Sequence, residues 1–318
     1  MKIRFTSPFI YWPTLVLASI GLGIGAGFLL HGIFKKPIEV VITDRAHYLP
    51  DMDAIMTHYE SVKSSSNDFT ELEPCEAINV AYKLFENLSK TRSIGVGKVN
   101  SLGMKQDIFT ATVHIDHRYM EESISKGIIN IYDRMYEEGD TTTRYWGNKS
   151  DYTQDTPSTL SNAEYEQLMG RRVSRSLIYI VSSKTMSNKD LSGLGLSKIT
   201  KNDKGYKVEV ELNPITGVID YQKQMQNISE LAAAPSFDYC HLSIQTDHDL
   251  NLLYSQADER YYAAPTKPIQ MPPVKCTANL VTVFRTDADE EINMIEYDDP
   301  VMHYPSSQQA LLERYHLN

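Results

Sequence analysis

The chain has 318 residues, of which 42% are hydrophobic and 10% aromatic, which is enough to build a sizeable core and excludes a disordered protein. The formal net charge is −10, but residues 1–36 contain four basic side chains and no acidic one, so the remainder carries −14. An acidic domain repels nucleic acid and anionic surfaces, and we expect no nucleic-acid partner.

An uncharged apolar segment lies close to the N-terminus. Residues 8–34 contain no Asp, Glu, Lys or Arg, and a run of this length crosses a bilayer with some tilt. Tyr11 and Trp12 suit one membrane interface, and two lysines end the segment at the other. A cleavable signal peptide is the alternative, but the run is long for one and no A-x-A site follows it. We predict an uncleaved transmembrane signal anchor over 1–36, with the bulk of the chain outside the cytoplasm.

A stalk and then a compact domain are expected after the anchor. Residues 37–70 combine short helical and strand-like pieces with the flexible break KSSSND, which is typical of a stalk. The domain is expected over 71–285. It begins with an amphipathic helix over 74–90, whose apolar stripe consists of Ala77, Ala81, Leu84, Phe85 and Leu88.

Segments of strand character dominate the first half of this domain. Residues 106–116 alternate, with Phe109 and Val113 on one face. Further strands over 127–140 and 141–147 continue an antiparallel meander. Beyond it, Ser161 and Glu164 form a capping box that begins a short helix, which Gly170 ends.

The second half continues the same pattern. Residues 205–213 alternate most clearly, with Val208 and Val210 on the apolar face. Asn213 and Pro214 then predict the start of a helix. Three more strands are expected over 237–246, 249–259 and 274–285. The acidic residues 286–318 lack a long apolar pattern, which predicts a mostly disordered or loosely docked tail.

Together these elements predict an α+β fold. Eight to ten short strands form a curved, mostly antiparallel sheet that packs with two or three helices. A strongly curved sheet of this kind is half-barrel-like and has an apolar concave side, which is a natural place for a hydrophobic ligand.

The order of elements resembles that of the LolA/LppX-like extracytoplasmic lipid-binding folds. The resemblance covers residues 73–285: a signal-type N-terminus, a long meander, the strand and helix of VEVELNPITGVIDYQKQ, and a final set of strands. It implies that an acyl chain or another apolar molecule binds on the concave face. The chain departs from the mycobacterial LppX pattern, because it has an apolar helix in place of a lipidated cysteine.

The predicted ligand-binding residues lie on the apolar faces of these strands. They are Phe109, Val113, Val208, Val210, Leu242, Ile244, Leu250 and Leu252.

Two polar clusters are candidate sites of chemistry. Asp247, His248 and Asp249 lie between two closely spaced strands, where such residues favour a turn, and neighbouring side chains on a strand point to opposite faces. The cluster at 114–117 has the same position between two strands. We therefore predict turns rather than a metal site, and neither a metal nor a cofactor. The three cysteines have no C-x-x-C spacing, and whether Cys240 and Cys276 pair stays open.

The sequence therefore predicts a non-enzymatic, membrane-anchored extracytoplasmic domain that binds or senses a lipid-like or other apolar ligand. The alternative is a structural or interaction subunit of a cell-envelope assembly with protein partners. A hydrolase built around Asp116, His117, Asp247 and His248 is a third hypothesis, without a G-x-S-x-G or similar motif to support it.

Overall fold

The computed structural model describes residues 45–127, 130–147, 157–229, 231–266, 272–286 and 304–317. The expected membrane anchor over 1–36 lies outside these ranges and stays a prediction. Among the residues that are described, none of the helices combines the length and the apolar character needed to cross a membrane.

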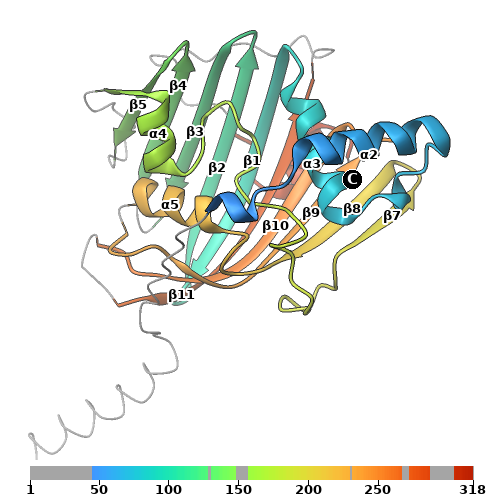
Figure 1. Ribbon diagram of the computed structural model, residues 1–318. Coiled ribbons are helices and arrows are strands. Elements are labelled where there is room, and N and C mark those ends of the chain that lie inside the picture. Colours follow the sequence, from blue (N-terminus) through green and yellow to red (C-terminus); the bar gives the residue numbers. More distant parts are fainter. Residues whose placement is uncertain are drawn as a thin grey trace, which may run out of the picture.

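Eleven of the described segments form one open antiparallel sheet, which curves around the helices packed on its inner face (Figure 1). The first meander consists of β1 (Lys90–Ser101), β2 (Met104–Ile115), β3 (Arg118–Lys126), β4 (Ile131–Glu138), β5 (Thr141–Gly147) and β6 (Ser158–Ser161). The second consists of β7 (Lys198–Asn202), β8 (Gly205–Leu212), β9 (Ser236–Thr246), β10 (Leu252–Ala263) and β11 (Val274–Arg285). The predicted α+β class with a mainly antiparallel, curved sheet is confirmed.

The two meanders join at the centre of the sheet. The strand order is β6-β5-β4-β3-β2-β1-β11-β10-β9-β8-β7, so the chain begins in the middle, runs outward to one edge and restarts at the other. The connection from β6 to β7 must therefore traverse the sheet. It contains α4 (Asn162–Met169) and residues 170–197, which we call the crossing segment.

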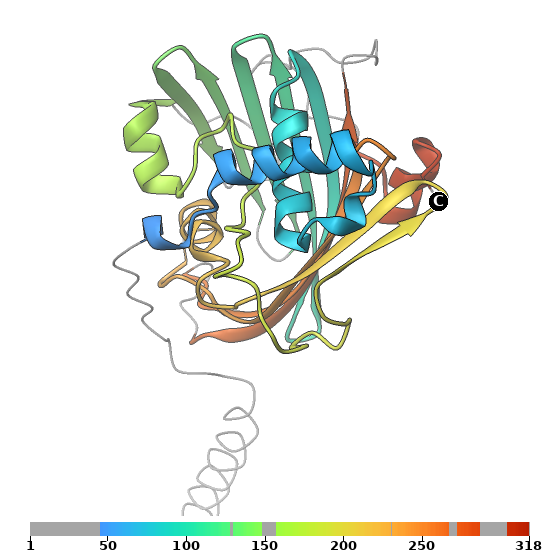
Figure 2. The same cartoon turned by 45° about the vertical axis from the view of Figure 1, so that its right-hand side comes forward.

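Helices cover both faces of the sheet. The inner, concave face carries α2 (Met52–Ser65), α3 (Pro74–Glu86), α4 and α5 (Ile219–Ile228), together with two short 3₁₀ turns, η1 (Arg45–Tyr48) and η2 (Phe69–Glu71) (Figure 2). The convex face carries α6 (Gln308–Arg314), whose Leu311 is fully buried against Ile94, Val96, Val281 and Val283.

Residues 45–70 differ from the expected stalk, because they fold onto the domain. Asp51 begins α2 by accepting a hydrogen bond from the backbone N–H of Ala54. Ile55, Tyr59 and Val62 recur at helical spacing and are buried in the main core, against α3 and the strands behind it. An apolar helix face of this kind needs a partner, and a free stalk would leave it in water.

The end of the chain was expected to be mostly disordered or loosely docked, and residues 304–317 are docked on the domain. The hydroxyl of Tyr304 donates to Glu122 Oε1 at 2.7 Å, and the ring of Tyr304 lies 5.1 Å from that of Phe109. Ser307 caps α6, which docks on β1 and β11. Although residues 286–318 are acidic overall, α6 contains one short apolar stripe, which is sufficient for docking.

The helix termini follow their local sequence signals to different degrees. The capping box of Ser161 and Glu164 begins α4 as predicted, and Gly170 ends it with φ of 85°. The helix expected at Asn213 begins later, at Ile219, because the Asn213 side chain instead accepts hydrogen bonds from the N–H groups of Ile215 and Thr216 in a turn. Cys240 and Cys276 are buried, free thiols.

Candidate functional site

A cavity of about 230 Å³ lies between the concave face of the sheet and the elements that cross it. Its floor is formed by the central strands β1, β2, β3, β9, β10 and β11, and its roof by residues 176–179 of the crossing segment and by α5. The fold creates this space because the crossing segment and α5 pass over the strands near the junction of the two meanders.

The floor of the cavity is rich in hydroxyl groups. The strand register places Ser255, Thr282, Gly95, Thr110 and Ser123 in one row across five neighbouring strands. A Cβ atom at Gly95 would lie 2.2 Å from Thr110 Oγ1, so only glycine leaves room for this row. The expected apolar concave side is thus found at the cavity together with these hydroxyl groups, because the strands also contribute side chains such as Val99, Ile108 and Leu242.

The roof is more apolar than the floor. Helix α5 lines the cavity with Tyr221, Gln224, Met225 and Ile228, which occupy one helical face at i, i+3, i+4 and i+7. The crossing segment adds Leu177, Ile178 and Tyr179. A ligand in the cavity would therefore meet apolar side chains from both sides, together with the hydroxyl groups of the floor.

One wall of the cavity contains the buried carboxylate of Glu259 on β10. The hydroxyl of Tyr179 donates to Glu259 Oε1 at 2.5 Å, and that of Tyr221 donates to Oε2 at 3.5 Å. The thiol of Cys240 lies 4.0 Å from Oε1. Burial raises the pKa of Glu259 from 4.5 to about 7, and hydrogen bonds from the two tyrosines oppose this shift.

A second carboxylate, that of Glu121 on β3, forms the opposite wall. Arg171 Nη2 donates to Glu121 Oε2 at 2.6 Å, and Gln224 Nε2 donates to Oε1 at 3.0 Å. Helix α5 thus contacts both walls, through Tyr221 at one and Gln224 at the other. The guanidinium group of Arg171 is thereby engaged inside the domain.

Only one of the eight predicted ligand-binding residues is among the described residues that line the cavity. Leu242 lines the cavity, and the described lining residues include none of the other seven. Phe109 and Val113 lie on the opposite face of β2 from the lining residues Ile108, Thr110 and Thr112. The remainder pack into the main core beneath α2 and α3: Val208, Val210, Ile244, Leu250 and Leu252.

The two polar clusters predicted as turns are turns. Asp247 Oδ1 accepts hydrogen bonds from the backbone N–H groups of Asp249 and Asn251, and Leu250 has φ of 64°. Asp116 has φ of 56° in the corner between β2 and β3, where its carbonyl contacts the ring of His114. Across the part of the chain that the structure describes, no three His, Cys, Asp or Glu side chains are placed to hold a metal ion.

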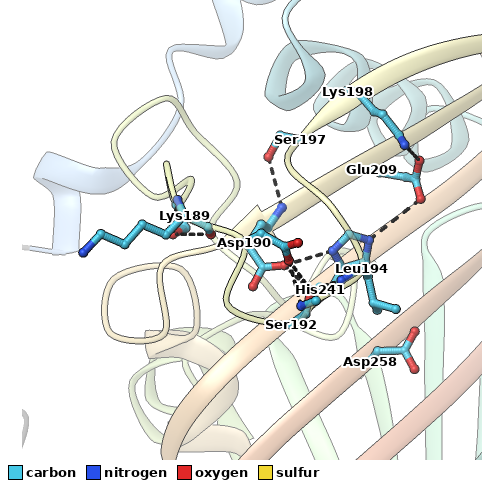
Figure 3. Close-up of polar contacts among 12 residues, drawn as sticks. Lys189, Asp190, Ser192, Leu194, Ser197, Lys198, Glu209, His241 and Asp258 are labelled. Carbon is cyan, nitrogen blue, oxygen red and sulfur yellow. Dashed lines mark hydrogen bonds and ion pairs between the residues drawn. The ribbon is translucent and has the colours of Figure 1, made fainter.

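A buried polar cluster that the sequence did not predict lies on the convex side of β8 and β9 (Figure 3). Glu211 Oε2 accepts a hydrogen bond from Ser192 Oγ at 2.6 Å and lies 3.0 Å from His241 Nδ1. The carboxylate, not the imidazole, is thus beside the hydroxyl, which is the wrong order for activating a serine nucleophile. Polar residues that alternate along a strand are usually predicted to face solvent. Here they are buried because the crossing segment covers them.

Comparisons with known proteins show similarity in arrangement alone. No family model matches the chain, and no curated protein matches it. Solved structures with a similar arrangement include the Mycobacterium tuberculosis lipoprotein LppX, with a TM-score of 0.30 and 9% identity over 71% of this chain and 98% of that one. They also include a DUF1329 family protein from Desulfovibrio piger, with a TM-score of 0.20 and 10% identity over 67% and 92% of the respective chains. LppX is among the proteins that the element order resembles.

Proposed function

We propose that this chain binds a small amphipathic, lipid-like ligand in the concave-face cavity and does not transform it. The observation that carries this proposal is the cavity itself, with its apolar roof and hydroxyl-bearing floor. Its volume of about 230 Å³ is below the roughly 300–1,000 Å³ of sites for drug-sized molecules. We therefore expect a small ligand or a single chain of a larger one.

The side chains of the cavity walls support binding rather than catalysis. Glu121 is held by Arg171 and Gln224, and Glu259 by Tyr179 and Tyr221. Carboxylates held in this way form a wall that orients a ligand, and within the described residues neither is paired with a second proton-transfer group of the kind that a catalytic dyad needs.

We further propose that residues 1–36 anchor the domain to a membrane, with the domain outside the cytoplasm. The uncharged segment over 8–34 supports this proposal. A domain held at a membrane surface meets amphipathic molecules that leave or enter the bilayer, which agrees with a cavity of mixed polarity.

A structural or interaction subunit of a cell-envelope assembly is the second candidate. Leu194 and Leu196 of the crossing segment are each 52% exposed, and Ile215 is 50% exposed. Exposed apolar side chains of this kind suit a protein contact.

Native mass spectrometry of the full chain, purified from its own membrane in mild detergent, tests the proposal. We expect a bound small molecule on the wild type and its loss from Ala257→Phe, because Ala257 lies in the cavity floor. The matched control is Gln256→Phe, which adds the same ring on the other face of β10 and should retain the added mass. If the added mass is absent from all three and a stoichiometric protein partner is present instead, the subunit hypothesis is favoured.

A further inference from the structure

The buried carboxylates of this domain differ in how their charge is balanced. Within the described ranges, every buried carboxylate except that of Glu259 lies beside a basic side chain. The pairs are Glu121 with Arg171, Glu122 with Arg134, Asp133 with Arg144, Glu137 with Arg172, Glu209 with Lys198 and Lys207, Glu211 with His241, and Asp220 with Arg45. Glu259 is only 3% exposed, and its described contacts contain no basic group.

The groups that face Glu259 are all neutral donors. They come from every element around it: Tyr179 from the crossing segment, Tyr221 from α5, Cys240 from β9 and Tyr261 from β10 itself. Burial raises the pKa of each of these hydroxyl and thiol groups well above its ordinary value, so they remain protonated. Asp258 is the nearest other charge, and it binds Gln256 and Asn279 on the opposite face of the strand.

A buried carboxylate without a cation is costly, since its own donors only partly replace water. Glu259 also lines the cavity, close to the apolar side chains of its roof. The cavity that Glu259 lines gives a cationic group a place beside the carboxylate, which no described basic side chain takes.

We infer that the ligand supplies the missing cation, and that the cavity takes an amine-bearing amphiphile whose ammonium group docks against Glu259 while its chain lies along Met225 and Ile228. This inference rests on the proposed function. The two hydroxyl donors hold the carboxylate in place, and the ammonium group completes a charge-assisted hydrogen bond. An anionic amphiphile is disfavoured, because it would bring a second negative charge beside the first.

Three eight-carbon probes that differ only in the head group test the inference: octylamine, octanol and octanoic acid. The full chain is held in lipid nanodiscs, titrated by calorimetry at pH 8, and corrected with empty nanodiscs. We expect octylamine to bind at least 10-fold more tightly than octanol, and octanoic acid to bind most weakly. Glu259→Gln should weaken octylamine binding at least 10-fold and leave octanol binding unchanged. Asp258→Asn removes one negative charge from the opposite face of the strand and should weaken octylamine binding far less than Glu259→Gln.

The outcomes separate the inference from the proposed function. If octylamine and octanol bind equally, or Glu259→Gln leaves octylamine binding unchanged, the inference is overturned while ligand binding in the cavity stands. If none of the three probes binds, both are overturned.

The wild type provides a second measurement, which does not depend on whether the variant folds. A primary amine with a pKa near 10.4 remains charged between pH 6 and 8, whereas a carboxyl with a pKa of about 7 ionises over this range. We expect octylamine affinity to rise about 10-fold from pH 6 to pH 8 and octanol affinity to stay constant. A flat octylamine profile contradicts the inference.

Discussion

The protonation of Glu259 links the stability of the domain to pH. Burial raises the pKa of this carboxyl from 4.5 to about 7, so the folded state holds its proton over a range in which the unfolded chain releases it. The folded state then binds more protons than the unfolded state, and the free energy of unfolding falls as pH rises from about 4.5 to about 7. Above that range the loss is complete, at about 3 kcal/mol.

Glu259→Gln removes this dependence at a single residue. We expect the free energy of unfolding of the variant, relative to the wild type, to rise by about 2–3 kcal/mol between pH 5 and pH 8. Urea denaturation of both proteins at the two pH values measures this double difference, in which the loss of any hydrogen bond cancels. A difference that is the same at both pH values would show that the carboxyl is not protonated in the folded state.

At the scale of elements, the junction between α4 and α5 depends on one glycine. Gly170 ends α4 in the left-handed region, and a Cβ atom there would lie 2.8 Å from the backbone of Asp220. The carboxylate of Asp220 in turn binds Arg45 of η1 at 2.7 Å. A side chain at residue 170 would therefore push α5, the roof of the cavity, away from two of its neighbours.

Gly170→Ala and Gly139→Ala form a matched pair. Gly139 also has a positive φ, of 57°, but nothing lies within 4 Å of the position of its Cβ atom. We expect Gly139→Ala to cost about 1 kcal/mol from backbone strain alone. Gly170→Ala should cost at least about 1–2 kcal/mol more, because the new methyl group meets the backbone of α5. Urea midpoints with unchanged m-values provide the measurement. If the two substitutions lower the free energy of unfolding equally, the methyl group at residue 170 does not clash with α5.

At the scale of the whole molecule, the C-terminal residues complete a second layer on the convex face. Leu311 is fully buried there, and Arg285 at the end of β11 lies 4.7 Å from the ring centre of Tyr315. We expect Leu311→Ala to lower the free energy of unfolding by about 2–5 kcal/mol, as for other buried leucines. Ile215→Ala, at a half-exposed position, should change it by less than about 0.5 kcal/mol. Similar small effects of both substitutions would mean that α6 is not docked in solution.

Local signals in the sequence predict much of the fold. The stripe of α3, the capping box of α4 and the alternation of β8 all depend on neighbouring residues. The capping box and the alternation are found where they were expected, whereas α3 ends at Glu86, so Leu88 of the expected stripe lies beyond the helix. The membrane anchor, by contrast, stays a prediction.

The cavity was harder to predict, because it depends on contacts between distant segments. Both faces of β2 contain apolar residues, so alternation alone does not show whether Ile108 or Phe109 faces the cavity. Glu259 follows Asp258 and precedes Arg260, which suggests a solvent-facing strand. Its tyrosine partners lie 80 and 38 residues away in sequence, and no local pattern reveals them.

The junction of β1 with β11 has a consequence for how the molecule folds. Each meander consists of strands that follow one another in sequence and can pair early, whereas β1 and β11 pair from Arg92 with Arg285 to Ser101 with Cys276 across most of the domain. Pairing of such distant segments is slow, because the entropy of closing a long loop is lost before the contacts form. Since both strands line the cavity floor, the cavity is complete only when β1 and β11 pair. A nascent chain therefore lacks the complete cavity until β11 has been synthesised.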